Sequence, residues 1–276
     1  MNLNYARGLL WLLCLLLGGC CVPTTKEYRA FYSHLRESIP CTKFTENQEN
    51  FLVIYVDARH LDYTDNVSFF KTVAKHPSDG SKNRDVGHAW IYLQGVVKGN
   101  TVFLEGGHSG ELGIRQAKYF DGIMNYIDFG YANPTDNQLS HPRYEPNPVK
   151  YLWETQHDGF FQWGQGRHRP SFAVKIGLTT EQLEEMIAFV QLYNYHEYSL
   201  VENQCCSFVK QVAALVDLEL DCEVTIPVCS QIVFNGEKIR FWEDPFYSEL
   251  TISSPDVLEK SLMQAVREGK VEFFTR

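Results

Sequence analysis

Residues 87–107 constrain the fold most, because they have the pattern of a β-hairpin. In GHAWIYLQG, His88 and two aromatic residues fall on one face and small or aliphatic residues fall on the other. VKGN follows as a turn signal, and TVFLEGG is a second strand-like run. An antiparallel pair over 88–93 and 101–107 is therefore predicted, with residues around 105 to 108 lying across from His88.

Other segments add strands and helices around this hairpin. Strands are predicted at 50–58 and 171–178, a second hairpin at 231–242 about an Asn-Gly turn, and helices at 180–193 and 254–269. Thr180 is the expected N-cap of the first of these helices. Residues 106–170 are rich in Gly, Pro, Asn, Asp and aromatic residues, which indicates a long loop-rich insertion. The predicted class is α+β, with an antiparallel sheet packed on helices.

The N-terminus has the order of an export signal. Arg7 provides a positive start, Leu9–Leu17 is an apolar run too short for the ~20 residues of a membrane span, and two glycines follow. Leu17–Cys20 reads LGGC and resembles the bacterial lipobox, in which the signal is cut before a lipidated cysteine. Residues 1–19 are thus predicted to be a signal peptide and Cys20 the lipidation site; an ordinary secretory signal is the alternative.

The rest of the chain divides into an anchor-proximal segment, 20–49, and one domain, 50–276, which carries the insertion. Hydrophobic residues make up 44% of the sequence, enough for a sizeable core. The net charge is −9 and no run of Lys and Arg occurs. This charge argues against a nucleic-acid partner and against electrostatic attachment to anionic lipid.

The cysteines do not have metal-site spacing. No C-x-x-C occurs among the eight cysteines, so neither a zinc site nor a thioredoxin-like motif is indicated. In an oxidising compartment, disulfides are possible among four of them, and the sequence does not assign pairs: Cys41, Cys206, Cys222 and Cys229. Three loop histidines also lack ligand spacing and are interpreted as surface residues: His141, His157 and His168.

Cys205 and Cys206 open a helix-like stretch, 205–216, whose apolar residues recur at spacings of three and four. Asn203 is a possible N-cap. A thiol in the first turn of a helix is close to the positive end of the helix dipole and to free backbone N–H groups, which stabilise a thiolate. A nucleophilic cysteine needs that stabilisation together with a nearby base. The alternative is simple packing, since free cysteines are often buried.

The order of GHAWIYL, FLEGG and, far downstream, NQCCSFV resembles the circularly permuted papain-like hydrolases of the NlpC type, which include the lecithin–retinol acyltransferase branch. The resemblance covers 87–218 in three short islands. It implies a permuted papain-like fold, with Cys205 as the nucleophile, His88 as the base and Glu105 as the polar residue that orients the base.

Two positions in the resemblance have alternatives. The family has Asn directly before the cysteine, and here Gln204 intervenes, so that Cys206 competes with Cys205 as the nucleophile. The connection between the two strands is longer than is usual in the family, and His108 competes with Glu105 as the third residue.

The resemblance implies a lipid-anchored cysteine hydrolase or acyltransferase that forms an acyl-enzyme on an amide or ester. Peptides, cell-wall peptides and acyl lipids are the implied substrates, and the membrane is a partner through the anchor. No metal or organic cofactor is implied. The alternative function is a non-catalytic envelope lipoprotein that uses the same fold for binding. The sequence does not indicate an oligomeric state.

Overall fold

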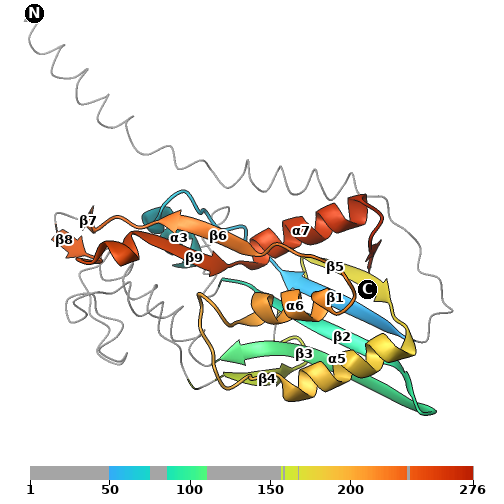
Figure 1. The fold of residues 1–276 in the computed structure, drawn as a ribbon. Coiled ribbons are helices and arrows are strands. Elements are labelled where there is room, and N and C mark those ends of the chain that lie inside the picture. Colours follow the sequence, from blue (N-terminus) through green and yellow to red (C-terminus); the bar gives the residue numbers. More distant parts are fainter. Residues whose placement is uncertain are drawn as a thin grey trace, which may run out of the picture.

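The computed structural model describes residues 50–74, 86–110, 157, 159–166, 168–234 and 237–275. Its centre is a six-stranded sheet in the order β10-β5-β1-β2-β3-β4, in which every neighbouring pair is antiparallel. The strands are β1 (Phe51–Asp57), β2 (His88–Val97), β3 (Asn100–Gly110), β4 (Gly159–Trp163), β5 (Phe172–Gly177) and β10 (Glu272–Phe273). Figure 1 shows β1 and β2 in the middle of this sheet.

Three helices cover one face of the sheet: α5 (Thr180–Leu192), α6 (Cys205–Ala214) and α7 (Pro255–Arg267) (Figure 1). Every second residue of β1 points into the core beneath them, and Leu52, Ile54 and Val56 are fully buried. The apolar faces of the helices complete this core, as the spacing of their buried residues requires.

The opposite face of β1 and β2 is also buried. Val53, Tyr55 and Trp90 form a second cluster there, and the Tyr55 and Trp90 rings stack with their centroids 5.1 Å apart. Burial on both faces explains why β1 is almost continuously apolar instead of alternating. Side chains near the C-terminal end of β1 are therefore in a water-poor environment on either face of the sheet.

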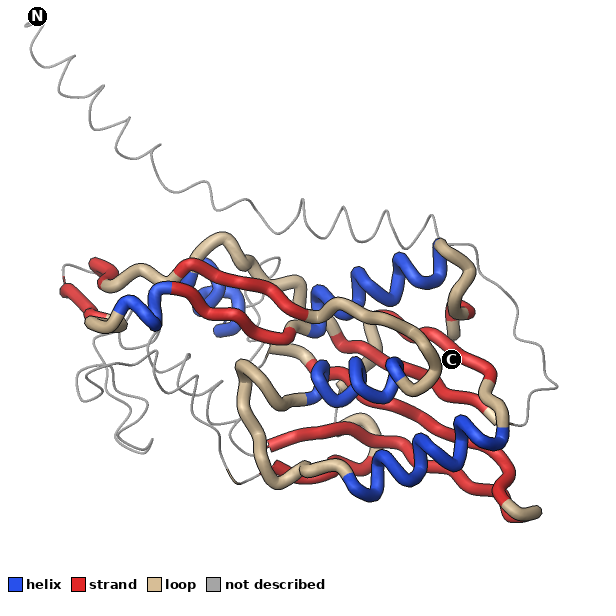
Figure 2. The backbone as a smooth tube through the Cα atoms, in the orientation of Figure 1, coloured by secondary structure: helices blue, strands red, loops and turns tan. Residues whose placement is uncertain are grey.

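A smaller apolar core lies beyond the end of the main sheet. It packs α3 (Asn66–Ala74) against the two-stranded sheet of β6 (Glu223–Pro227) and β9 (Glu249–Ser253), with Phe69, Ile226 and Leu250 fully buried. The hairpin of β7 (Gln231–Phe234) and β8 (Glu237–Arg240) and the short 3-10 helix η3 (Pro245–Ser248) extend this part (Figure 2).

The α+β class and both predicted hairpins are confirmed. Two details of the sequence analysis are wrong. The N-cap of α5 is Thr179, which accepts a hydrogen bond from Gln182 N, and Thr180 is already helical. The predicted loop-rich insertion at 106–170 contains ordered strand: β3 continues to Gly110 and β4 pairs with it.

The signal peptide, the lipobox with Cys20 and the anchor-proximal segment 20–49 lie outside the described residues. So do most of the predicted insertion and the Asn-Gly turn of the second hairpin. None of the helices within the described ranges is both long and apolar enough to cross a bilayer.

Candidate active site

Helix α6 presents Cys205 at its first position. Gln204 is the N-cap: its side-chain oxygen accepts from Cys206 N at 3.0 Å, and its backbone N–H donates to Ser207 Oγ at 2.8 Å. The expectation of Asn203 as N-cap is therefore wrong, because the Asn203 side chain is used elsewhere, accepting from Tyr193 Oη at 2.5 Å. The residue inserted before the cysteines thus has a structural role, which is to cap the helix.

His88 is the first residue of β2 and is 4% exposed. It follows Gly87, whose φ of +94° is in the region that favours glycine. A Cβ at position 87 would lie 2.3 Å from the backbone oxygen of Asp57, so only glycine lets the chain pass so close to the end of β1. This local geometry fixes where the imidazole of His88 enters the site.

The environment of Cys205 favours the thiolate. The pKa of its thiol lies well below the ordinary value, first because Cys206 hydrogen-bonds to it and then because of hydrogen bonding and charge from His88 and the backbone N–H of Ala89. These effects outweigh burial, which acts in the opposite direction. The structure thus brings together two of the residues predicted from the sequence, Cys205 and His88.

The hydrogen bond of the neutral Cys205 thiol goes to Gln204 and leaves one ring nitrogen of His88 unused within the described residues. Cys205 Sγ donates to Gln204 Oε1 at 3.0 Å, and Nε2 of His88 is buried without a hydrogen-bond partner in the described ranges. When Cys205 loses its proton, the thiolate becomes an acceptor and a protonated His88 ring becomes its donor. A nitrogen with unused capacity beside an acidified thiol is the setting that a nucleophile and its base need.

Cys206 has the opposite chemistry. Its Sγ lies 3.9 Å from that of Cys205, and the side chain is completely buried in the core under α6. Burial is the main reason that the pKa of Cys206 lies well above the ordinary value, and hydrogen bonding and charge from Cys205 and the charges of Cys222 and Asp256 act in the same direction. Of the two thiols, Cys205 is therefore the one whose environment favours ionisation, and Cys206 is the one whose environment favours the neutral thiol.

The rates of alkylation at pH 7 are expected to reflect the opposite pKa shifts of Cys205 and Cys206. Iodoacetamide should modify Cys205 at least about tenfold faster than Cys206, since only the thiolate reacts and one pKa unit is a tenfold change in its population at pH values below the pKa. Quantitative mass spectrometry of peptides after short pulses measures both rates. Cys222, which is also buried and has a raised pKa, serves as an internal slow reference. Faster modification of Cys206 would show that Cys206, and not Cys205, is the reactive thiol.

Glu105 does not take the position expected of it. It pairs across the strands with Tyr92, four residues along β2 from His88, which is about 13 Å of strand. Its Oε1 accepts from the indole of Trp90 at 3.2 Å. The prediction that Glu105 orients His88 is thus not supported by the strand register, because the hairpin pairs differently from what the sequence analysis assumed.

His108, the competing third residue, is fully buried on the helix side of β3. Its Nε2 lies 2.9 Å from the backbone oxygen of Tyr195, so Nε2 carries the proton and Nδ1, which is buried and unpartnered within the described ranges, is an acceptor. Burial lowers the pKa of His108; the backbone contact and the charge of Cys205 raise it, and the charge of His88 lowers it. His108 is accordingly a neutral neighbour of the pair.

Two residues beside His88 were missed by the sequence analysis. Asp57 is the direct cross-strand partner of His88 in the β1–β2 register. The ring of His168 lies 4.7 Å from that of His88, and its Nδ1 is 2.9 Å from Asp57 Oδ2. The interpretation of His168 as a surface residue is wrong, since only 17% of its side chain is exposed. The available signal was the position of Asp57 at the end of a buried strand.

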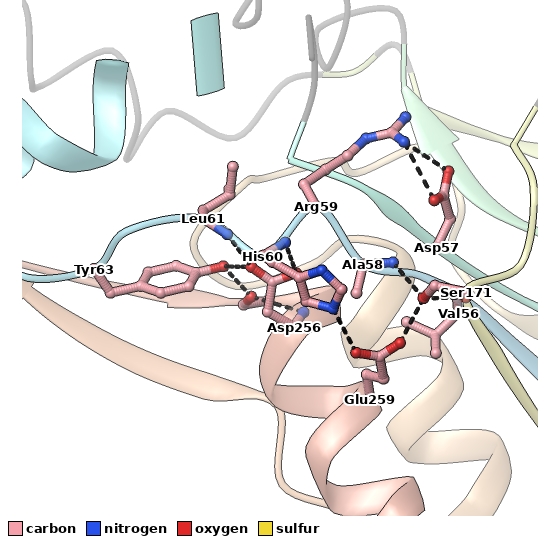
Figure 3. Close-up of polar contacts among 11 residues, drawn as sticks. Val56, Asp57, Ala58, Arg59, His60, Leu61, Tyr63, Ser171, Asp256 and Glu259 are labelled. Atoms are coloured by element: carbon pink, nitrogen blue, oxygen red, sulfur yellow. Dashed lines mark hydrogen bonds and ion pairs between the residues drawn. The ribbon is translucent and has the colours of Figure 1, made fainter. Parts of the chain in front are cut away.

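The loop after Asp57 is held by two buried carboxylates of α7 (Figure 3). Asp256 accepts from the backbone N–H groups of His60 at 2.8 Å and Leu61 at 2.7 Å. Glu259 lies 2.8 Å from His60 Nε2 and accepts from Ser171 Oγ at 2.6 Å. These contacts fix the end of β1, and with it the side of the site that faces His88.

The described cysteines are all free thiols: Cys205, Cys206, Cys222 and Cys229. Cys41 lies outside the described residues. Over the described ranges, no group of three or more His, Cys, Asp or Glu side chains is arranged to hold a metal ion.

Comparison with known proteins does not add a relative. A scan against protein-family models, a search of curated proteins and a search of solved structures found no match.

Proposed function

We propose that this protein is an exported, lipid-anchored cysteine hydrolase or acyltransferase with a permuted papain-like domain, in which Cys205 is the nucleophile and His88 the base. One observation carries the proposal: Cys205 lies at the N-terminus of α6 beside His88, and its pKa is lowered by that neighbourhood. The order of the elements supports the papain-like relationship, because the strand that carries His88 precedes the helix that carries Cys205. The strand and the helix pack on the same hydrophobic core.

The reaction needs no group beyond these side chains and water. His88 takes the proton of the Cys205 thiol, and the thiolate sulfur forms a bond to the carbonyl carbon of an amide or ester. The bond from that carbon to the leaving nitrogen or oxygen breaks, and His88 returns the proton to the leaving group. Water or another hydroxyl or amine then attacks the thioester carbon while His88 takes its proton; the carbon–sulfur bond breaks to release the acyl group, and the proton returns to the Cys205 sulfur.

The test is covalent capture of an acyl group. The protein is incubated with small activated esters and with amide-based electrophiles, and the site of modification is located by mass spectrometry. The wild type should be modified at Cys205, Cys205→Ser should remain unmodified, and Cys206→Ser should still be captured. If the wild type captures no electrophile in either class, the hydrolase proposal fails and the non-catalytic binding lipoprotein is favoured.

The membrane anchor is part of the same proposal and has its own prediction. Metabolic labelling with a radioactive or clickable fatty acid in a bacterial host is expected to mark the wild type, because LGGC ends in the cysteine that a lipobox modifies. Cys20→Ser should remove the label completely. Cys21→Ser is the matched control, since it changes the adjacent thiol and should keep the label. Equal labelling of the two variants, or none in the wild type, would contradict the anchor.

A further inference from the structure

Two segments that are distant in sequence meet on the side of His88 that the proposed chemistry has not used: the end of β1 with the residues just after it, and the segment before β5. β1 contributes Asp57, directly across from His88. The segment before β5 contributes His168, which contacts both of them. Arg59 binds the same carboxylate, with Nη1 at 3.2 Å from Oδ1 and 3.1 Å from Oδ2 (Figure 3). The Asp57 side chain is 8% exposed, so this cluster is largely removed from solvent.

We propose that Asp57 and His168 form a positioning pair that holds the ring of His88 and stabilises the imidazolium formed when Cys205 gives up its proton. The inference rests on the proposed function, because it assigns His88 as the base. It goes beyond the Cys–His pair by placing the orienting carboxylate on the strand before the histidine strand, in place of Glu105 on the strand after it.

The ring contacts argue for the orienting role. The ring of His88 contacts two aromatic rings: Trp90 at 5.7 Å with an interplanar angle of 14°, and His168 at 4.7 Å with an angle of 32°. Contact with two roughly parallel rings restricts rotation of the imidazole about its χ2 bond. His168 is itself held by its bond to Asp57, which makes the arrangement self-supporting.

The charges argue for the electrostatic role. Within the described residues, the titratable groups around His88 include Cys205 from α6, His108 from β3, Asp57 from β1 and His168 from the segment before β5, and Arg59 is ion-paired to Asp57. Among these groups Asp57 is the carboxylate, and an anion on the strand position opposite His88 would stabilise the imidazolium that forms when Cys205 ionises. The Arg59 guanidinium offsets part of the negative charge of Asp57. If Asp57 were neutralised, the positive charge of Arg59 would remain near His88 without its counter-charge.

The measurement is the pH profile of Cys205 alkylation by iodoacetamide, which reports the thiolate population without requiring turnover. For Asp57→Asn, the imidazolium loses its anion, so the profile should move to higher pH by about one unit, a tenfold slower reaction on the acid side of the midpoint. The matched control is Asp62→Asn. Asp62 is a similarly buried carboxylate in the same loop, bonded to Thr64 N, and its profile should match the wild type.

Variants of His168 separate positioning from packing. His168→Asn keeps a donor near the place of Nδ1 but removes the ring that contacts His88, and should move the profile by less than His168→Phe does. His168→Phe keeps a ring but removes the donor to Asp57, and should move the profile in the same direction as Asp57→Asn. This pair also carries the test if Asp57→Asn does not fold, since Asp57 and Arg59 stay in place.

Two results would overturn the positioning pair: an Asp57→Asn profile that superimposes on the wild type in a folded protein, or a His168→Phe profile that does so. A purely structural role predicts lower melting temperatures with unchanged profiles. The outcomes also separate the two proposals. Profile shifts without any acyl capture would reject the proposed function and keep the pair, whereas capture without shifts would do the reverse.

Discussion

Replacing His88 with alanine is expected to slow covalent capture of a weak acyl electrophile by roughly 10²–10⁴-fold, the usual contribution of a general base. The loss has two physical origins. The thiol of Cys205 loses the hydrogen bond and the charge that lower its pKa, and the leaving group loses its proton donor. The measurement is the rate of acyl-adduct formation at Cys205 by intact-mass spectrometry, at one pH and one probe concentration.

Two controls show whether the slower capture by His88→Ala is caused by loss of the base. His196→Ala removes an exposed histidine and should capture the probe at the wild-type rate. A strong alkylating agent should still modify Cys205 in His88→Ala at high pH, where the thiolate forms without help, so that the loss is traced to chemistry and not to access. If His88→Ala captures weak acyl electrophiles as fast as the wild type does, His88 is not the base.

Asp256→Ala should lower the free energy of unfolding by about 3–5 kcal/mol. The carboxylate is fully buried and accepts from His60 N, from Leu61 N and, at 2.8 Å, from Tyr63 Oη. Alanine would leave these donors without their acceptor, at about 1–3 kcal/mol for each buried donor, and only part of this is offset by removing a buried charge. Urea unfolding followed by circular dichroism measures the difference.

The cost should depend on pH in a defined direction. Burial is the main reason that the pKa of Asp256 is raised, so the folded protein binds a proton more tightly than the unfolded chain does. The stability from that proton is fully present below the unfolded pKa of about 3.9 and is lost as pH rises through the folded pKa. The difference between wild type and Asp256→Ala should therefore be larger near pH 4 than at pH 7.

Asp244→Ala is the control for this experiment. Asp244 also accepts from a backbone N–H, that of Phe246 at 2.9 Å, but it caps a short exposed 3-10 helix. Its loss should cost about 1 kcal/mol. Equal costs for the two variants would show that the buried contacts of Asp256 contribute no more than a surface cap.

The sequence predicted the elements well where periodicity was strong, and it failed where register mattered. The β2–β3 hairpin was expected, yet its strands are longer than the segments first assigned, because the turn is only Lys98-Gly99 and both residues have positive φ. Val97 pairs with Asn100, and continuing this register places Ser109, not Glu105, across from His88. The pairing register of a hairpin follows from the residues that form its turn. The sequence pattern located the turn only approximately, so it did not give the register.

The site was predicted in part for a related reason. Cys205 and His88 each have a local signature, a helix start and a strand start. Asp57 has only its place at the end of a buried strand, and His168 has no signature; the contact between them joins residues 111 apart and depends on which strands are neighbours. The role of Gln204 was hidden as well, since a glutamine side chain that folds back to cap its own helix has no distinct pattern in the sequence.

The bonds from Asp256 to the loop after β1 span 196 and 195 residues of chain. A polypeptide made from its N-terminus contains β1, His88 and Cys205 well before Asp256 exists. Contacts between such distant segments form slowly, because the long intervening chain must first close. In a nascent chain, then, the thiol and the imidazole would already be present while the strand end opposite His88 was still unanchored. Helix α7, which is synthesised after Cys205, then supplies the carboxylate that anchors this strand end.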